Sequence, residues 1–232
     1  MDLSQYWNLV IIALISYIIG SIPTALIVSK RVFGFDIREK GSGNMGSTNA
    51  FRLLGWKWGL FIQVIDILKG VIPVVVVVNY FGLNIVFPNN INWFNDLILV
   101  RIFAGFFAII GHVFTVFAGF RGGKGVNTLA GMLIGIAPID MSIAVVAFIL
   151  VVIFSGYISL GSMIAGCAFP LSLLVRFNIF RDNMPEYPVL IYFALFISVF
   201  LIFTHRQNIA RLLKGNENKF NKLQLIKLGK KN

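Results

Sequence analysis

Three polar segments interrupt an otherwise apolar sequence, and the first of them runs from residue 41 to residue 52. It includes three glycines, three hydroxyl side chains and two asparagines, ends on an arginine, and contains no acidic residue. Glycines allow consecutive backbone N–H groups to converge on an anion, and arginine can bind a phosphate through two hydrogen bonds. The segment therefore indicates a site for phosphate or another anion, formed by Gly41, Ser42, Gly43, Asn44, Ser47, Thr48, Asn49 and Arg52. The plainer alternative is a flexible loop in which Thr48 or Asn49 caps the next helix.

The second segment runs from residue 111 to residue 128 and contains Arg-Gly-Gly-Lys-Gly at residues 121–125. If this sequence opens a helix, Lys124 supplies a point charge and the helix N-terminus supplies free N–H groups, which together favour a bound phosphate. The spacing of a nucleotide-hydrolysing P-loop is absent, so nucleotide hydrolysis is disfavoured. A basic loop beside the membrane is the plainer alternative, and His112 is expected to be a structural histidine.

The third segment begins at His205 and ends at Glu217. On a helix, His205 and Asn208 are three residues apart and share one face, and a histidine there can also donate to an anion. Gly215 is expected to end this helix. An amphipathic helix at the membrane surface is the alternative, and we expect it to describe the residues from Arg211 onward.

Two further charged residues, Asp66 and Lys69, lie three positions apart within an apolar stretch. Charged side chains inside a membrane are costly and often functional, but opposite charges at this spacing can also neutralise each other. The sequence leaves both interpretations open.

These segments belong to a chain of 232 residues that is 58% hydrophobic and only 12% charged. A soluble domain of this size has too much surface to hide so many apolar side chains, so lipid must surround the chain. The single cysteine, Cys167, excludes an internal disulfide, and one cysteine with two histidines excludes the usual zinc sites. We expect no metal ion and no cofactor, and no motif supports nucleic-acid binding.

We expect an all-α integral membrane protein of about seven transmembrane helices, since each span needs about 20 apolar residues. The helices are expected within residues 6–28, 56–80, 97–118 and 189–203, with three short helices between residues 126 and 175 that are divided near Pro138 and at Ser155–Gly156. Lys and Arg follow the first, third and last helices, which places the N-terminus outside and the C-terminus in the cytoplasm. One polytopic domain is expected over residues 1–217, followed by a basic cytoplasmic tail over residues 218–232.

Together the three segments resemble the motifs of the PlsY family, the bacterial membrane glycerol-3-phosphate acyltransferases that use acyl-phosphate as donor. The matching sequences are Gly-Ser-Gly-Asn-x-Gly-x-Thr-Asn at residues 41–49 with Arg52, Gly-His-x-Phe and Gly-Gly-Lys-Gly-Val within residues 111–126, and His-Arg-x-Asn-Ile-x-Arg-Leu at residues 205–212 with Gly215 and Glu217. Thr115, Asn127 and Thr204 depart from the residues usual in the family, which bears on the geometry of the helix ends rather than on the chemistry.

The resemblance implies a seven-helix enzyme of the bacterial cell membrane whose three motifs meet at the cytoplasmic face. It implies transfer of a fatty acyl group from acyl-phosphate to the sn-1 hydroxyl of glycerol-3-phosphate, which yields lysophosphatidic acid and phosphate in the first acylation of phospholipid synthesis. The implied partners are these two substrates, membrane lipids and the phosphate acyltransferase that supplies acyl-phosphate, with no nucleic acid.

The residues are compatible with such a reaction, because acyl-phosphate is a mixed anhydride whose phosphate leaves readily and electrostatic stabilisation with positioning can supply most of the catalysis. We expect direct attack by the glycerol hydroxyl without an acyl-enzyme, with the proton passing to His205 or, as we favour, to a substrate phosphate. Catalytic roles are assigned to Ser42, Arg52, Lys124 and His205, and substrate binding to Gly41, Gly43, Asn44, Thr48, Asn49, Gly122, Gly123, Gly125 and Asn208.

A small membrane transporter of phosphate or a phosphate ester is the alternative from another functional class, since loops near helix ends also serve transporters. Transporter sites lie near the bilayer midplane, whereas all three motifs are predicted at one surface. A structural adaptor with a lipid-binding tail would leave the two glycine-rich loops unexplained.

Overall fold

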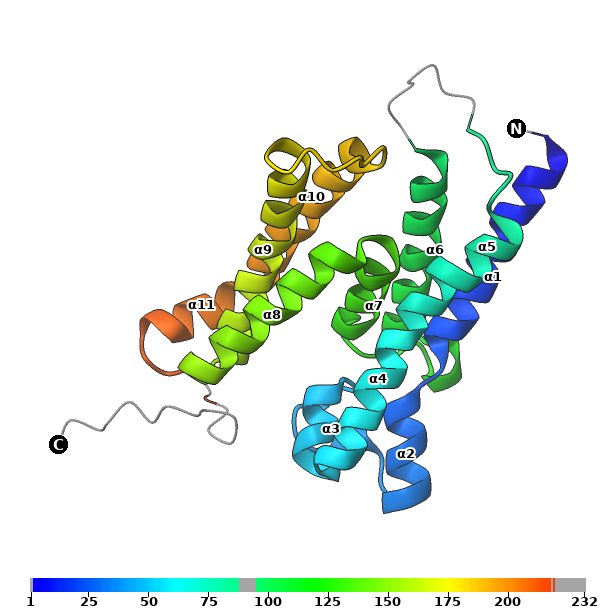
Figure 1. Cartoon of the computed structure of the whole chain (residues 1–232). Coiled ribbons are helices and arrows are strands. Elements are labelled where there is room, and N and C mark those ends of the chain that lie inside the picture. Colours follow the sequence, from blue (N-terminus) through cyan, green and yellow to red (C-terminus); the bar gives the residue numbers. More distant parts are fainter. Residues whose placement is uncertain (1, 88–94, 218, 220–232) are drawn as a thin grey trace. The chain divides into compact units, whose positions relative to one another are not determined.

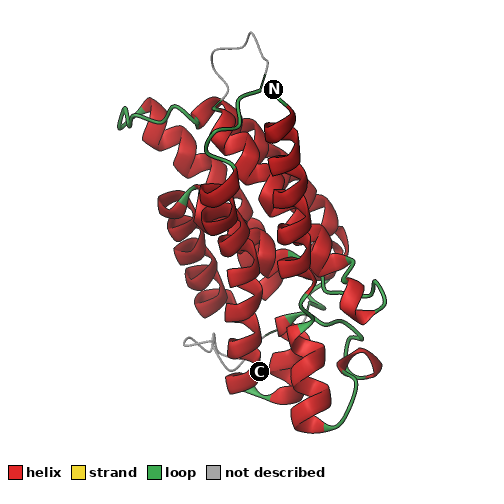
Figure 2. Cartoon of the chain, turned by 90° about the vertical axis from the view of Figure 1, so that its right-hand side faces the viewer, coloured by secondary structure: helices red, strands yellow, loops and turns green. Residues whose placement is uncertain are grey.

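The computed structural model describes residues 2–87, 95–217 and 219. Within these residues the regular elements are helices and no strand occurs, as Figure 2 shows. The chain divides into two compact units, Met1–Ala137 and Pro138–Asn232. The expectation of an all-α fold is confirmed for the described residues.

In the first unit, long helices carry shorter ones at their ends (Figure 1). The α-helices are α1 (Leu3–Ser21), α2 (Thr24–Phe33), α3 (Ser47–Leu54), α4 (Trp56–Ile72), α5 (Val78–Phe81), α6 (Asp96–Val113) and α7 (Val126–Ile136). Two 3-10 turns, η1 (Ile37–Glu39) and η3 (Val116–Ala118), lie in the loops, and a π-helical turn, η2 (Pro73–Val77), joins α4 to α5. This turn begins at a proline, whose nitrogen has no hydrogen to donate to the preceding turn.

Local residues set the ends of these helices. The Asp2 side chain accepts a hydrogen bond from a backbone N–H in the first turn of α1, and the Asn95 side chain does the same for α6. Pro23 separates α1 from α2, because a proline cannot continue the hydrogen-bond pattern of a helix. Ile22 and Pro23 both have non-helical backbone angles, so α1 and α2 are separate helices.

Glycines let the long helices of this unit touch backbone to backbone. Helix α1 packs against α6, and α4 packs against α7. A Cβ atom at Gly20 would lie 2.0 Å from the Ala108 carbonyl oxygen, and one at Gly131 would lie 1.9 Å from the Ile67 carbonyl oxygen. Small residues of this kind dominate helix contacts in lipid, where no hydrophobic effect drives helices together.

The second unit contains α8 (Pro138–Ser155), α9 (Ile158–Asn178), α10 (Tyr187–Thr204) and α11 (Arg206–Leu213). Helix α9 packs against both α8 and α10. The buried carboxylate of Asp140 accepts hydrogen bonds from Ser172 Oγ (2.7 Å) and Arg176 Nη1 (2.6 Å). These bonds tie the start of α8 to the last turns of α9 and leave no unpaired charge on this acid.

Six helical segments of the described residues are long and apolar enough to cross a membrane, namely Leu3–Phe33, Trp56–Phe81, Asp96–Ala118, Pro138–Ser155, Ile158–Asn178 and Tyr187–Thr204. Helix α7 is apolar but has only 11 residues. The expected divisions near Pro138 and after Ser155 are confirmed. Of the three helices expected to be short, only α7 is, because α8 and α9 have 18 and 21 residues.

Other expectations about the architecture stay predictions. These are a seventh spanning helix, the N-terminus outside the cell, and a single domain over residues 1–217. The basic tail at residues 218–232 lies outside the described residues except for Lys219.

The contact between α4 and α7 makes a prediction about stability. A Gly131→Ala substitution places its Cβ against the Ile67 backbone, which cannot move away unless the helices separate. We expect the free energy of unfolding to fall by about 1–3 kcal/mol, the usual effect of overpacking, and to appear as a lower Tm in detergent. The control is Gly166→Ala, whose nearest atom is the end of the flexible Leu201 side chain. Equal losses in the two variants would contradict the backbone contact.

Candidate functional site

The first polar segment is organised around the buried side chain of Asn49, in α3, which is 2% exposed. Its Oδ1 atom accepts a hydrogen bond from the Ser42 N–H (3.0 Å). Its Nδ2 group donates to the backbone carbonyl oxygens of Asn44 (3.0 Å), Lys40 (3.1 Å) and Ile37 (3.3 Å). Asn49 therefore fastens the loop onto α3, a role that sequence reasoning did not assign to it.

Three backbone amides of this loop are hydrogen-bonded to nearby residues. The N–H groups of Ser42, Gly43 and Gly46 donate to Asn49 Oδ1, the Lys40 carbonyl and Asn44 Oδ1, over 2.8 to 3.1 Å. The expected nest of free N–H groups around an anion is therefore wrong for these three amides. Glycine is required here by shape, because Gly41 and Gly43 have φ of +63° and +69°, and a Cβ atom at Gly41 would lie 2.3 Å from Asn49 Oδ1.

Several polar side chains of the first two segments are exposed. Ser42, Thr48 and Arg52 of the first segment are exposed, and so is Lys124 of the second. Neither Arg52 nor Lys124 forms an ion pair with another residue of the described ranges. Exposed cations without an acidic partner are available to an anionic ligand.

The second polar segment lies directly on the end of α6. The Gly122 N–H donates to the Val113 carbonyl (2.9 Å), and the Gly123 N–H donates to the His112 carbonyl (3.1 Å). These amides, like those of the first loop, are not free to cradle an anion. A Cβ atom at Gly122 would lie 1.9 Å from the His112 carbonyl oxygen, so these glycines allow the loop to sit against α6.

The start of α7 supplies a further set of backbone amides. Gly125 is its N-cap residue, with φ of +76°, and provides no side-chain cap for the first turn. The N–H groups of a first helical turn have no partner within the helix, and the helix dipole adds partial positive charge there. Lys124 immediately precedes this turn, so the charge and the amides are adjacent in the chain.

A hydrogen bond joins the first two segments, and a second one joins the second segment to the residues just before the first. Asn127 Nδ2 donates to Ser47 Oγ (2.9 Å), across 80 positions of sequence. Arg38, just before the first segment, donates to the Ala118 carbonyl (2.9 Å) and to both carboxylate oxygens of Asp36 (3.0 and 2.7 Å). The hydrogen bonds from Arg38 hold the pKa of Asp36 well below its usual range, so this acid is charged and already paired.

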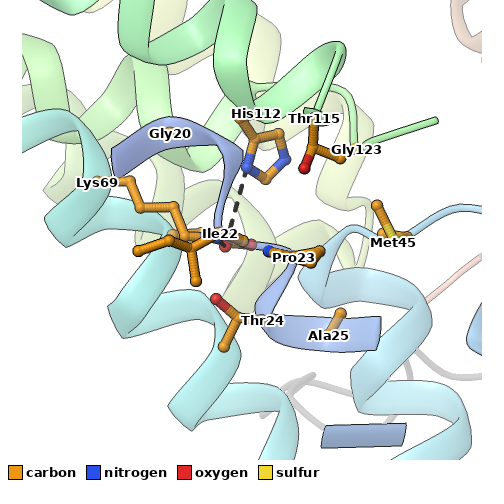
Figure 3. Close-up of a pocket in the computed structure, with 11 residues that line it drawn as sticks. Gly20, Ile22, Pro23, Thr24, Ala25, Met45, Lys69, His112, Thr115 and Gly123 are labelled. Atoms are coloured by element: carbon orange, nitrogen blue, oxygen red, sulfur yellow. Dashed lines mark hydrogen bonds and ion pairs between the residues drawn. The ribbon is translucent and has the colours of Figure 1, made fainter. Parts of the chain in front are cut away.

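A small cavity lies beneath both segments (Figure 3). Its lining includes Met45 of the first segment, Gly123 of the second, and the buried residues Asp66, Lys69 and His112. Lys69 Nζ donates to Asp66 Oδ1 (2.6 Å), and His112 Nδ1 lies 3.9 Å from the same oxygen. Asp66 and Lys69 therefore neutralise each other, which is one of the two interpretations that the sequence left open. Their ion pair lies next to the candidate site.

The third polar segment belongs to the second unit, where His205 lies at the junction of α10 and α11 rather than within one helix. His205 Nδ1 lies 2.8 Å from the Leu201 carbonyl oxygen. Because a carbonyl only accepts, Nδ1 carries a proton, and the neutral form of the ring therefore has its lone pair at Nε2. Gly215 ends the helix as expected, with φ of +70° and a hydrogen bond from its N–H to the Leu212 carbonyl.

Glu217 holds this third segment in place. Its Oε1 atom accepts from Asn208 Nδ2 (2.7 Å) and Ser159 Oγ (2.9 Å), and its Oε2 atom accepts from Arg211 Nε (2.7 Å). Burial alone would raise the pKa of Glu217, but these hydrogen bonds outweigh burial and lower the pKa. Sequence reasoning gave Glu217 no role, although it is the only acid in an otherwise basic segment.

The structure thus brings the first and second segments together within one unit. The third segment is part of the other unit, and its meeting with the first two stays a prediction. The catalytic and binding roles assigned to individual side chains also stay predictions.

Comparisons with known proteins all indicate the same family. Residues 10–215 match the family described as glycerol-3-phosphate acyltransferase. The chain is 47% identical to the glycerol-3-phosphate acyltransferase of Chlorobium chlorochromatii (strain CaD3), over 91% of this chain and 97% of that protein. It is 46% identical to that of Chlorobaculum tepidum, over 95% of this chain and 97% of that protein.

A solved structure is similar as well. The crystal structure of PlsY (YgiH), an integral membrane glycerol 3-phosphate acyltransferase, in its glycerol 3-phosphate form gives a TM-score of 0.71 at 32% identity, covering 93% of this chain and 96% of that chain. The lysophosphatidic acid form of PlsY gives a TM-score of 0.70 at 31% identity, over 93% of this chain and 97% of that chain.

The hydrogen bonds of Asn49 can be tested by a substitution of nearly equal size. Asn49→Asp keeps the acceptor for the Ser42 N–H but turns an oxygen toward three carbonyl oxygens. Because a buried polar group without a partner costs about 1–3 kcal/mol, the loop should open about tenfold more often, measured as the rate of tryptic cleavage after Lys40. Thr48→Ala, at an exposed neighbouring position, is the control. Cleavage of the aspartate variant at the wild-type rate would refute the role of Asn49.

Glu217 makes the third segment sensitive to acid. A lowered pKa in the folded state contributes stability above the ordinary glutamate pKa, and this stability is lost as the pH falls through the lowered value. We expect hydrogen-exchange protection of residues 206–216, corrected for intrinsic rates, to fall on acidification. Glu217→Gln should lower protection already at pH 7 and remove the dependence on pH, whereas Glu186→Gln, outside this cluster, should not. Unchanged protection in the Glu217 variant would contradict the anchor.

Proposed function

This chain belongs to the glycerol-3-phosphate acyltransferase family and is an integral membrane acyltransferase, and from that premise we propose that it transfers a fatty acyl group from acyl-phosphate to the sn-1 hydroxyl of glycerol-3-phosphate. The products are lysophosphatidic acid and inorganic phosphate. The related PlsY has been crystallised in a glycerol 3-phosphate form and in a lysophosphatidic acid form, which supports this choice of acceptor and product.

The observation that carries the proposal is the set of exposed polar groups on two segments that the hydrogen bond from Asn127 to Ser47 joins. Arg52 and Lys124 supply positive charge, and Ser42 supplies a hydroxyl, while Ser47 and Asn127 hold the segments in register. Both proposed substrates carry a phosphate, so two cationic groups match the charge that must be bound. The first turn of α7 adds amide donors beside Lys124.

The proposed mechanism is direct attack without an acyl-enzyme. The sn-1 oxygen forms the new ester bond to the acyl carbon, and the bond between that carbon and the phosphate oxygen breaks. The hydroxyl proton passes to a substrate phosphate, and inorganic phosphate leaves. The charge on the phosphates and on the developing oxyanion is stabilised by Ser42, Arg52 and Lys124. For such a reactive donor, this electrostatic stabilisation is the largest contribution to lowering the activation barrier.

His205 and Asn208 are proposed to orient glycerol-3-phosphate once the third segment meets the other two. The lone pair at His205 Nε2 can accept from a glycerol hydroxyl, because Nδ1 is occupied by the Leu201 carbonyl. Asn208 keeps its Oδ1 atom for the substrate while Nδ2 is held by Glu217. These contacts hold the acceptor in position for attack, and so contribute to catalysis by orienting the reacting groups.

We place the reaction at the cytoplasmic face of the bacterial cell membrane, with the N-terminus outside. No cofactor is needed, because the mixed anhydride brings its own leaving group. A phosphate acyltransferase that supplies acyl-phosphate is the expected partner. Membership of an acyltransferase family favours this enzyme over the phosphate transporter that the sequence left as an alternative.

The decisive measurement is phosphate release by the purified chain given acyl-phosphate, with and without glycerol-3-phosphate, and with acyl-CoA as the parallel donor. We expect release that requires both substrates, no transfer from acyl-CoA, and a loss of about a hundredfold or more in Lys124→Ala, the usual effect of removing a transition-state donor. Lys57→Ala, at an exposed lysine outside the three segments, should retain activity.

Three results would contradict the proposal. Equal transfer from acyl-CoA would refute the donor. An acylated Ser42 trapped with donor alone would refute direct attack. No release from any donor by well-folded protein would return the transporter to consideration, with flux into liposomes as the next measurement.

A further inference from the structure

A buried charged cluster lies under the second glycine loop, and the proposed reaction does not use it. Asp66, Lys69 and His112 are 2%, 3% and 8% exposed. They come from α4 and α6 and line the cavity that also touches Gly123 (Figure 3). Charges at such a position are retained in membrane proteins chiefly where they are paired and serve the function.

Both the main chain and the ring of His112 meet the loop. The His112 carbonyl accepts the Gly123 N–H (3.1 Å), and a Cβ atom at Gly123 would lie 2.2 Å from His112 Nε2. The loop therefore rests on the imidazole itself, and only a residue without a side chain fits at position 123. The side chain of Lys124, the next residue, is exposed.

The opposite edge of the ring faces the ion pair. His112 Nδ1 lies 3.9 Å from Asp66 Oδ1, the same oxygen that accepts from Lys69 Nζ at 2.6 Å. Lys69 also donates to the Ile22 carbonyl (2.6 Å), in the link between α1 and α2. The ion pair is thus fixed to this link, and the ring lies between the ion pair and the loop.

We propose that His112 is a positioning residue of the acyl transfer. Its ring, held in place by Asp66 and Lys69, fixes the position and direction of the Gly123–Lys124 backbone. In this way it directs the side chain of Lys124 toward phosphate. This inference rests on the proposed role of Lys124. It gives the second glycine of the loop a defined purpose, which is to admit the ring of His112 rather than to offer an N–H to the ligand.

A double-mutant cycle separates these two purposes of Gly123. Asparagine at position 112 keeps an amide near Nδ1 but ends before Nε2, whereas glutamine extends to the place of Nε2. Gly123→Ala is combined with native His112, with His112→Asn and with His112→Gln in the full-length chain. The matched control is Gly122→Ala, whose Cβ would meet the His112 backbone oxygen at 1.9 Å and which no change of the ring can relieve.

Two readouts are taken on each variant, together with its Tm. One is kcat/KM for phosphate release from acyl-phosphate and glycerol-3-phosphate. The other is the rate at which an amine-reactive reagent modifies Lys124, followed by peptide mass spectrometry, which needs no acyl donor. If the native chain releases no phosphate, the proposed function has failed, and the cycle is still decided by the modification rate.

We expect Gly123→Ala to reduce kcat/KM by about tenfold or more with His112 or His112→Gln, and by less than about twofold with His112→Asn, since contacting residues couple in such cycles. Gly122→Ala should cost the same in all three backgrounds. His112→Gln alone should retain more activity than His112→Asn at similar Tm. The Lys124 modification rate should change in the same variants that lose kcat/KM.

The opposite pattern overturns the inference. If Gly123→Ala costs as much with His112→Asn as with His112, the glycine serves the ligand and not the ring. If His112→Asn and His112→Gln lose activity only in proportion to folded protein, the histidine is merely structural. Should His112→Asn fail to fold, His112→Ala combined with Gly123→Ala supplies the same comparison, and a persisting alanine penalty there is equally decisive against the proposal.

Discussion

Helix α1 ends at the buried residue Ser21, and the last carbonyl groups of a helix have no donor within the helix, so other parts of the chain must supply one. Pro23 has no N–H to offer. The Thr115 hydroxyl donates to the Ser21 carbonyl, and Lys69 Nζ donates to the Ile22 carbonyl at 2.6 Å. These bonds bring the loop after α6 and the last turn of α4 to one junction, and both polar segments of the first unit lie beside it.

The polar residues around this junction fall into two groups, one buried and one exposed. Groups that lie inside, such as Asn49 and Asp66, have their hydrogen bonds satisfied by the protein and hold loops and helices in place. Groups that face outward, such as Arg52 and Lys124, are left for a ligand. The rigid inner set is what allows the outer set to be pre-organised, which is the condition for electrostatic catalysis.

Three acidic residues of the described chain follow the same rule. Asp36 is paired with Arg38, Asp66 with Lys69, and Glu217 with Arg211. A free carboxylate beside the exposed cations would compete with phosphate for them. Ion pairs occupy the carboxylates of Asp36 and Asp66, and for the buried Asp66 the pair avoids the cost of an unpaired charge.

The sequence by itself determined the apolar helices, the breaks at Pro138 and Gly215, and the three polar segments, because hydropathy, proline and left-handed glycine act locally along the chain. It also identified the family from the order of those segments. The sequence could not show which glycine N–H groups are free to bind an anion, since that depends on which acceptor lies opposite each N–H in the fold. That was decided by tertiary structure, which turned the amides of Gly43 and Gly123 inward and placed Asn127 against Ser47. The physical reason is that a hydrogen bond between residues 80 positions apart forms only where packing brings its two ends together, and no local pattern records that distance.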